Sequence, residues 1–324
     1  MLTKEKIYQQ AFALKQNRRK EKEKQRDILL AAAYQAYPRL AEIEREQAAV
    51  GAQLAIAALS DMVRLNDLKQ RSEALSAEKR CLLEKAQVKD ITYDCPVCRD
   101  TGYVAGKICD CVKAIATELT FAELSGEMPL ADSRFDNFDL KYYPNRPDAN
   151  GRDPRRRMTG IFKTCTEYVL HFDPKQSKNL LFMGKSGLGK THLSLAIVGG
   201  VLNKGFLPVY GSAENLFDRI AREKFSGADG GAYESMIKAD LLVIDDLGAE
   251  METSLSRSAL YNLVNTRLLA GRPVIINTNL SMKEIAERYT ARISSRLIGH
   301  YEAWEFLGTD IRQQKALEEQ THGV

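Results

Sequence analysis

Residues 180–202 read LLFMGKSGLGKTHLSLAIVGGVL, and this stretch decides the fold of the chain. The apolar run Leu180–Met183 predicts a buried strand, the pattern G-x-x-x-x-G-K-T follows at once, and a helical pattern comes next. Glycines let the backbone curl so that several N–H groups face one anion, and the helix beginning near Lys190 adds its positive dipole end. The stretch therefore predicts a nucleoside triphosphate site, formed by Gly184, Lys185, Ser186, Gly187, Leu188, Gly189, Lys190, Thr191 and the adjoining His192. Because His192 follows the loop inside the helix, packing is the favoured alternative for its side chain. Within the site, Lys190 is expected to neutralise β/γ-phosphate charge and the Thr191 hydroxyl to bind Mg²⁺.

Short apolar runs alternate with helical patterns on both sides of this loop. This alternation predicts an α/β domain with a parallel sheet between two layers of helices. Five strands are expected, at Leu180–Met183, Leu207–Tyr210, Leu241–Ile244, Val274–Ile276 and Tyr301–Leu307.

Two further segments carry polar side chains directly after a predicted strand. In ADLLVIDDLGAE, residues 239–250, a buried strand should bring Asp245 beside the loop to hold Mg²⁺ through water. Asp246 is then placed to orient or deprotonate an attacking water. In PVIINTNLS, residues 273–281, we expect the strand to lie between the loop strand and the Asp245 strand, so that Asn279 contacts the γ-phosphate or positions water. Turn chemistry is the alternative for Asn279, because asparagine favours turns.

Arg292 and Arg296 lie one helical turn apart in RYTARISSRLIGH, residues 288–300. They are either solvated or able to reach the nucleotide of a neighbouring subunit as arginine fingers. Between the second and third strands, residues 212–240 leave room for two helices. There Phe217, Arg219, Arg222, Lys224 and Phe225 mix basic and aromatic side chains suited to phosphate contact and base stacking, although the phenylalanines are equally suited to a core.

Four of the six cysteines form a C-x-x-C and a C-x-C pair separated by ten residues: Cys95, Cys98, Cys109 and Cys111. Two such pairs around a glycine-containing turn can place four thiolates tetrahedrally around Zn²⁺. Structural zinc is the favoured reading, with an iron–sulfur centre or no metal as alternatives. Cys81 and Cys165 are interpreted as small buried residues.

The N-terminal ninety residues are dominated by helix formers, with one proline, Pro38, and one glycine, Gly51. Apolar residues at near-heptad spacing predict two or three helices that pack lengthwise. Nine basic residues against three glutamates lie within Lys4–Arg26, which indicates either a solvated face or a contact with nucleic acid or an acidic partner.

Composition excludes several classes of protein. With 324 residues, 44% hydrophobic and 28% charged, the chain is too apolar to be disordered throughout and has the length of two domains. It shows neither a run of ~20 apolar residues nor a secretory h-region, so we expect a cytoplasmic protein without membrane contact.

The segments YDCPVCRDTGY…CDC, FDNFDLKYY, NLLFMGKSGLGKTHLS, LLVIDDLGAE, IINTNLS, RYTARISSRLIGHYEAWEF and GTDIR, in this order, resemble the AAA+ ATPases. Within that class they are similar to DnaC/DnaI-type replicative helicase loaders and the related IstB transposition ATPases, over about residues 91–312. The resemblance implies that residues 184–191 are the Walker A loop, Asp245 and Asp246 the Walker B pair, and Asn279 sensor 1. It places Arg292 and Arg296 in the arginine-finger region and Arg312 where a sensor 2 arginine is expected.

Two features depart from the general AAA+ pattern. The second Walker B acid is Asp246 rather than glutamate, which favours slow hydrolysis, and the chain stops about twelve residues after Arg312, too soon for the usual helical lid. Lid-less ends are familiar in these loaders.

The resemblance implies a domain order and a function. We expect a helical partner-binding region at 1–90, a zinc module at 91–125, a linker or wrapping segment at 126–157 and an AAA+ ATPase domain at 158–324. The implied function is ATP-dependent loading of a hexameric DnaB-type helicase onto single-stranded DNA, with ATP, Mg²⁺ and Zn²⁺ as cofactors and ATP-dependent head-to-tail assembly. The alternatives are an IstB-like ATPase that assists a transposase and a non-hydrolysing adaptor with a structural nucleotide.

Overall fold

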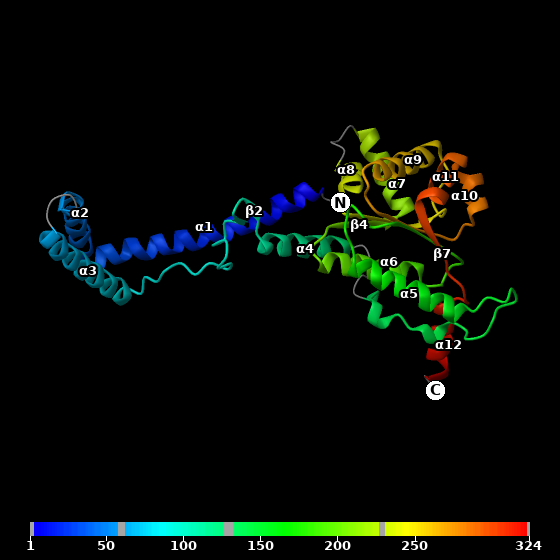
Figure 1. Ribbon diagram of the computed structural model, residues 1–324, viewed down its shortest axis with the longest axis horizontal. Helices are drawn as coiled ribbons and strands as arrows, with labels where there is room; N and C mark the ends of the chain where they lie inside the picture. Colours follow the sequence, from blue (N-terminus) through cyan, green and yellow to red (C-terminus); the bar gives the residue numbers. More distant parts are fainter. Residues whose placement is uncertain (1–2, 58–61, 126–131, 227–230, 323–324) are drawn as a thin grey trace. The chain divides into compact units, whose positions relative to one another are not determined.

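The computed structural model in Figure 1 describes residues 3–57, 62–125, 132–226 and 231–322. The chain divides into two compact units. One is formed by Met1–Ala11 together with Lys113–Val324, and the other by Phe12–Val112. Each unit has its own core.

The larger unit is built on a five-stranded parallel sheet in the order β4-β5-β6-β3-β7. Its strands are β3 (Asn179–Met183), β4 (Pro208–Ser212), β5 (Leu241–Leu247), β6 (Val274–Thr278) and β7 (Tyr301–Glu305). All five expected strands are present, and β6 lies between β5 and β3 as predicted. Because the strands are parallel, the residues that follow β3, β5 and β6 meet at one edge of the sheet.

Helices cover both faces of this sheet (Figure 1). Alternation along β5 shows how the sequence achieves this, because Leu242 and Ile244 face one helical layer while Leu241 and Val243 face the other. One layer consists of α5 (Pro154–Leu170) and α6 (Lys190–Asn203). The other consists of α7 (Ala213–Ser226), α8 (Gly231–Lys238), α9 (Ser254–Leu269), α10 (Met282–Tyr289) and α11 (Ala291–His300). The predicted α/β class and the two helices between the second and third strands are confirmed.

The segment before α5 wraps around the phosphate-loop side of the larger unit. It contains two short 3-10 turns, η2 (Phe135–Asn137) and η3 (Leu140–Tyr142), and then Tyr143, whose side chain is fully buried. The larger unit ends with α12 (Ile311–His322).

The N-terminal helices are α1 (Lys4–Ala36), α2 (Arg39–Ala57) and α3 (Met62–Lys85). The near-heptad spacing predicted the seam between α2 and α3, where Ile43, Val50 and Ala57 pack against Leu68 and Leu75. The smaller unit also holds the hairpin β1 (Tyr103–Val104) and β2 (Lys107–Ile108), and α4 (Asp110–Ser125) begins at its end. In the described part of the chain, no helix is both long and apolar enough to cross a membrane.

Candidate functional site: a nucleotide cavity and a cysteine cluster

The loop between β3 and α6 has the backbone shape that its glycines permit. Gly184, Gly187 and Gly189 have φ values of 141°, 78° and 84°, in the region where side chains are strained. A side chain at Gly189 would also approach Phe138 and the Tyr143 hydroxyl to 3.0 Å. The Tyr143 hydroxyl donates to the Leu188 carbonyl at 3.0 Å, so the wrapping segment fixes the loop from behind.

Lys190, the first residue of α6, is a buried cation with neutral partners. Its side chain is 5% exposed, and Nζ donates to the carbonyls of Gly184 and Lys185 at 2.7 and 2.8 Å and to Asn279 Oδ1 at 2.7 Å. Burial lowers the pKa of Lys190. No carboxylate of the described residues forms an ion pair with it, although the nearby Asp246 and Asp245 charges oppose the lowering of its pKa, so the residues present fit a phosphate group.

The Asp245 carboxylate is held by both oxygens at the end of β5. Oδ1 accepts from Asn277 Nδ2 at 2.7 Å and from the Asp246 amide at 2.9 Å, while Oδ2 accepts from the Tyr210 hydroxyl. Asn277 Nδ2 also lies 2.6 Å from Ser194 Oγ on α6, and Asn277 Oδ1 is buried without a partner among the described residues. Asp245 is 4% exposed, so these bonds hold it in one orientation.

Asp246 differs from Asp245 in exposure and backbone. Its side chain faces solvent, and its φ of 49° lies in the left-handed region. Partial burial and the neighbouring Asp245 charge raise the pKa of Asp246. A carboxyl with a raised pKa beside a phosphate-binding loop is suited to proton transfer with water.

A cavity of about 430 Å³ opens over the loop. Ser186, Lys190, Thr191, Asp245 and Asp246 line its phosphate side. The other side is lined by Asn137, Phe138, Asp139, Tyr142, His192, Ile311, Arg312 and Lys315. Phe138 and His192 lie with ring centroids 5.4 Å apart, and burial lowers the pKa of His192. Aromatic rings beside a phosphate loop suit a base and its triphosphate.

The C-terminal segment closes one side of this cavity. Arg312 Nη2 donates to Ser186 Oγ at 2.6 Å, and the Ile311 amide donates to the Gly187 carbonyl at 2.9 Å. Asp310 lies so close to Gly187 that a β-carbon there would come within 2.1 Å of its carboxylate. Gly187 is thus required by close approach as well as by backbone shape.

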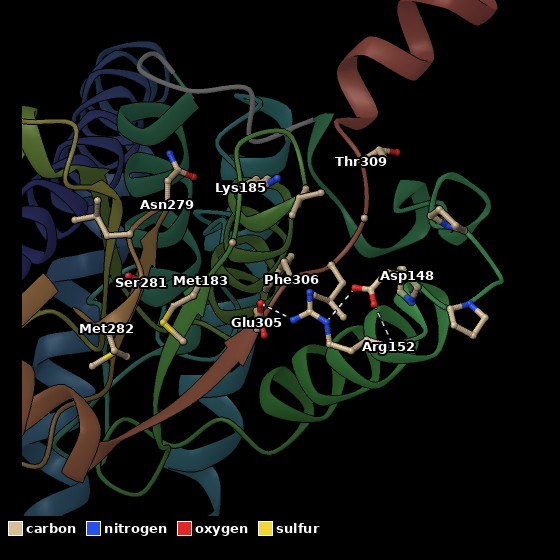
Figure 2. Close-up of a pocket in the computed structure, with 18 of the residues that line it drawn as sticks. Asp148, Arg152, Met183, Lys185, Asn279, Ser281, Met282, Glu305, Phe306 and Thr309 are labelled. Atoms are coloured by element: carbon tan, nitrogen blue, oxygen red, sulfur yellow. Dashed lines mark hydrogen bonds and ion pairs between the residues drawn. The ribbon is translucent and has the colours of Figure 1, made fainter. Parts of the chain in front are cut away.

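A second, larger cavity of about 870 Å³ lies beside the loop and shares Leu188 and Asn279 with the first. Figure 2 shows Arg152 at its rim, between Asp148 and Glu305. The Arg152 guanidinium donates to these carboxylates at 3.0 and 2.9 Å. This trio joins the wrapping segment to the end of β7.

The predicted arginine-finger residues lie on α11. Arg292 is exposed, whereas Arg296 donates to Asn265 Oδ1 at 2.9 Å and to the Tyr261 hydroxyl at 3.0 Å. Neither is among the described residues that line the 430 Å³ cavity.

The basic and aromatic residues of α7 fall into two groups. Phe217 is 4% exposed and belongs to the core, whereas Phe225 is 81% exposed. Arg222 and Lys224 are exposed, Arg219 is half-buried, and Arg222 lies 3.9 Å from Asp218. Of the two phenylalanines, Phe225 is therefore the one available for stacking.

The four predicted cysteines meet in the smaller unit. Their sulfur atoms all lie within 4.8 Å of one another, with Cys95 and Cys109 at 3.8 Å and Cys98 and Cys111 at 3.5 Å. Sulfurs about 2.3 Å from a tetrahedral zinc lie about 3.8 Å apart, so this donor set fits Zn²⁺. A hydrogen bond from the Cys98 backbone helps lower the pKa of Cys95 to about 7. Cys165 is buried as expected, but Cys81 is exposed, so that interpretation was wrong.

A buried ion pair supports the cysteine cluster. Asp100 accepts from the amides of Asp94 and Cys95 at 2.8 Å, and Lys15 Nζ lies 2.8 Å from its Oδ1. Both side chains are almost fully buried. Such support orients the backbone that presents metal ligands.

Sequence reasoning missed Tyr210, Asn277, Phe138 and Tyr142. For Tyr210 and Asn277 the available signal was their position near the ends of strands that flank β5. For Phe138 and Tyr142 it was the FDNFDLKYY segment, which carried part of the family resemblance.

The chain is similar in sequence to one protein family and to several curated proteins. Residues 169–318 match the family described as IstB-like ATP binding protein. The chain is 27% identical over 145 residues to the replicative helicase loader DnaC of Escherichia coli strain K12, covering 44% of this chain and 58% of DnaC. It is 25% identical over 151 residues to an ATP-binding protein of insertion sequence IS5376 from Geobacillus stearothermophilus, covering 45% and 60%. The chain thus spans little more than half the length of these curated relatives.

Solved structures similar to this chain include the DnaC helicase loader and DnaI. The DnaC structure is 21% identical with a TM-score of 0.47, covering 55% of this chain and 98% of that one. The DnaI structure is 23% identical with a TM-score of 0.45, covering 57% and 94%.

Proposed function

We propose that this chain, whose residues 169–318 form an IstB-like ATP-binding domain, loads a hexameric replicative helicase onto single-stranded DNA in an ATP-dependent manner. The observation that carries the nucleotide part is the buried Lys190 cation, which has neutral partners and lines a cavity of base-and-phosphate size. Similarity to the DnaC loader supports the helicase part.

In this proposal the residues at the carboxyl edge of the sheet bind ATP and magnesium. The amides of residues 184–191 and the Lys190 ammonium hold the phosphates, and Phe138 and His192 contact the base. Thr191 and Asp245 are the residues that would hold Mg²⁺, Asp245 through water, and the hydrogen bonds from Tyr210 and Asn277 keep the Asp245 carboxylate in one orientation. Magnesium would supply neutralisation of the phosphate charge.

Hydrolysis is proposed to depend on Asp246 and Asn279. Asp246 receives a proton from, or orients, the attacking water, and Asn279 fixes Lys190 and the γ-phosphate side of the site. The aspartate is one methylene shorter than a glutamate, so we expect slow turnover that DNA or the helicase stimulates. Arg312 at Ser186 is proposed as the sensor 2 residue.

Assembly and partner binding are assigned to other parts of the chain. Arg296, with Arg292, is proposed to reach the nucleotide of a neighbouring copy in a head-to-tail assembly. The exposed α7 residues Arg222, Lys224 and Phe225, with Arg219, are proposed to contact single-stranded DNA. Residues 1–90 and a zinc-loaded cysteine cluster are proposed to bind the helicase.

The decisive experiment is co-purification of the full-length chain with the replicative helicase of its own organism, with and without ATP. We expect ATP to change the amount of complex and to permit delivery of the helicase to single-stranded DNA. Lys190→Ala should abolish the ATP effect, whereas Lys185→Ala, in the same loop but exposed, should retain most of it. Normal loading by the Lys190 variant would exclude ATP as a switch, and absence of any complex would exclude the helicase.

The similarity to the IS5376 protein favours one alternative, an ATPase that assists a transposase. That function predicts ATP-dependent binding to duplex DNA and to a transposase. A preference for single strands and for the helicase would eliminate it.

A further inference from the structure

A third cavity, of about 810 Å³, lies at the edge of the sheet opposite the phosphate loop. Lys175, Phe206, Asp240 and Arg272 line it, and each lies within four residues before the start of β3, β4, β5 or β6. The phosphate loop follows the other end of β3. The two sites therefore lie at opposite edges of one parallel sheet, and this cavity is separate from the nucleotide site.

The lining of this cavity is strongly basic. It contains five cationic side chains and one carboxylate, Asp240, with the cations being Lys4, Lys113, Lys175, Lys204 and Arg272. Lys4 Nζ lies 2.7 Å from Asp240 Oδ1, and the Leu207 amide donates to Oδ2 at 2.9 Å, so the only acid is already compensated. Beside this pair, three further cations, Lys175, Lys204 and Arg272, have no other acid to balance them among the described residues that line the cavity.

Several of these cations are held in place by neutral groups. Lys204 Nζ donates to the Val169 carbonyl at 2.8 Å, and Arg272 Nη1 donates to the Ala239 carbonyl at 3.2 Å. Carbonyls orient a cation without cancelling its charge. The fully buried Arg267 lies nearby and donates to the same Ala239 carbonyl at 3.0 Å. Burial, and secondarily the Arg272 charge, lower the pKa of Arg267 to about 9.

The cavity is accessible and carries an aromatic ring. Lys113, Lys175 and Lys204 are exposed at its rim, and Tyr8 of α1 is half-buried in its wall. Like charges clustered this closely cost stability unless an anion offsets them. Cations around a groove that also presents an aromatic ring suit a single strand, whose unpaired bases can stack. A ring beside the cations supplies a stacking face for a base.

We propose that this cavity, lined by Lys4, Tyr8, Lys113, Lys175, Lys204 and Arg272, binds the phosphate backbone of single-stranded nucleic acid. This would be a second contact with single-stranded nucleic acid, on a surface distinct from α7. The inference rests on the proposed function only in taking the nucleic acid to be single-stranded. The phosphates lie against the lysines and Arg272, and one base stacks on Tyr8. ATP is not required for the contact, because its residues lie away from the phosphate loop.

The test measures binding of a labelled oligothymidylate of about 20 nucleotides to the full-length chain by fluorescence anisotropy across a salt series. The variants are Lys175→Gln and Lys175→Gln/Lys204→Gln. The matched control is Lys178→Gln, which removes the same charge from the same loop at a residue that does not line the cavity. Each lost phosphate contact should reduce the slope of log K against log salt by about 0.7, and the double variant should bind about tenfold more weakly near physiological salt. Tyr8→Leu should weaken binding without changing the slope.

If Lys175→Gln and Lys178→Gln weaken oligothymidylate binding equally, the cavity assignment is wrong. The two variants would then reflect only non-specific electrostatic attraction between the protein and the oligonucleotide. An unchanged affinity in the double variant would overturn the assignment as well. If the double variant loses a poly-glutamate peptide yet retains oligothymidylate, the site binds acidic protein and the nucleic-acid assignment is wrong. The α7 variant Arg222→Gln/Lys224→Gln, measured in parallel, separates failure here from failure of the proposed α7 contact.

Discussion

The Tyr210 hydroxyl donates a hydrogen bond to Oδ2 of Asp245, from β4 to the neighbouring β5. Both side chains are at least 95% buried, and Asn277 on β6 approaches Oδ1 from the other side. Strand β5 therefore fixes only the position of the Asp245 backbone. The two flanking strands determine where its oxygens point.

Replacing Tyr210 with phenylalanine should weaken nucleotide binding only when magnesium is present. Loss of a hydrogen bond to a charged group costs about 1.5–3 kcal/mol, so we expect about a tenfold or greater loss of affinity for magnesium–ATP. Affinity for ATP in excess EDTA should be unchanged. Titration of a fluorescent ATP analogue under both conditions measures this, with Tyr168→Phe as control because the Tyr168 hydroxyl bonds only the Lys178 carbonyl. An equal loss with and without magnesium would show a general packing defect.

Replacing Lys190 with methionine should abolish stabilisation by ATP without lowering the stability of the nucleotide-free protein. Burial lowers the pKa of Lys190, so the charged form is held in the fold at a cost that methionine removes. Wild type should gain about 2.7 kcal/mol at ATP concentrations one hundred times Kd, and the variant should gain almost nothing. Thermal unfolding with and without ATP checks this. A nucleotide-free variant that unfolds well below wild type would mean that Lys190 has a structural role.

Replacing Asp246 with asparagine should stop hydrolysis and slightly stabilise the fold at neutral pH. The pKa of Asp246 is raised in the fold, so the folded state binds a proton more tightly than the unfolded state, and ionisation costs stability above that pKa. Asparagine removes this cost and also tolerates the φ of 49°. Solvent screens the exposed carboxylate, so we expect a rise in Tm of only about 1–2 °C.

The gain from Asp246→Asn should disappear as pH falls below the ordinary aspartate value of 3.8, where both states are protonated. Tm measured from about pH 3 to about pH 8 follows this difference. A gain that does not depend on pH would assign it to the backbone alone.

The cysteine cluster should hold one zinc ion per chain. Cys98→Ser should lose the metal and lower the Tm of the smaller unit, because the ion supplies folding energy to a segment with few apolar residues. Cys81→Ser, which alters an exposed cysteine outside the cluster, should keep both the bound metal and the Tm of the smaller unit. Elemental analysis of the purified protein and a chelator titration followed by thermal unfolding measure the two effects. Full metal content in the Cys98 variant would contradict a four-cysteine site.

Elements specified by local sequence were predictable. The glycines and Lys190 of the phosphate loop, the apolar run before Asp245 and the spacing of the four cysteines each lie within a short segment, so one stretch of chain carries the whole signal. The place of β6 between β3 and β5 was expected because Asn279 must reach the loop, and Lys190 contacts Asn279 in the structure.

Contacts between distant segments were not predictable in the same way. Tyr210 and Asn277 are ordinary strand residues until the sheet order places them on either side of Asp245, 35 and 32 residues away. Phe217 and Phe225 lie eight residues apart on one helix, and composition alone could not assign the first to the core and the second to solvent. Tyr143 lies in a segment whose prolines and glycines suggest a linker, yet its ring is fully buried behind the phosphate loop.

Residues 3–11 belong to the unit that contains the sheet. Ile7 and Ala11 are buried in it, and Lys4 supplies the cation for the nearly buried Asp240. A fragment expressed from residue 113 onward would therefore carry an uncompensated carboxylate and a gap in its apolar surface. A truncated protein could therefore lose activity because it no longer folds. The function of each region is better tested by point substitutions in the full-length chain.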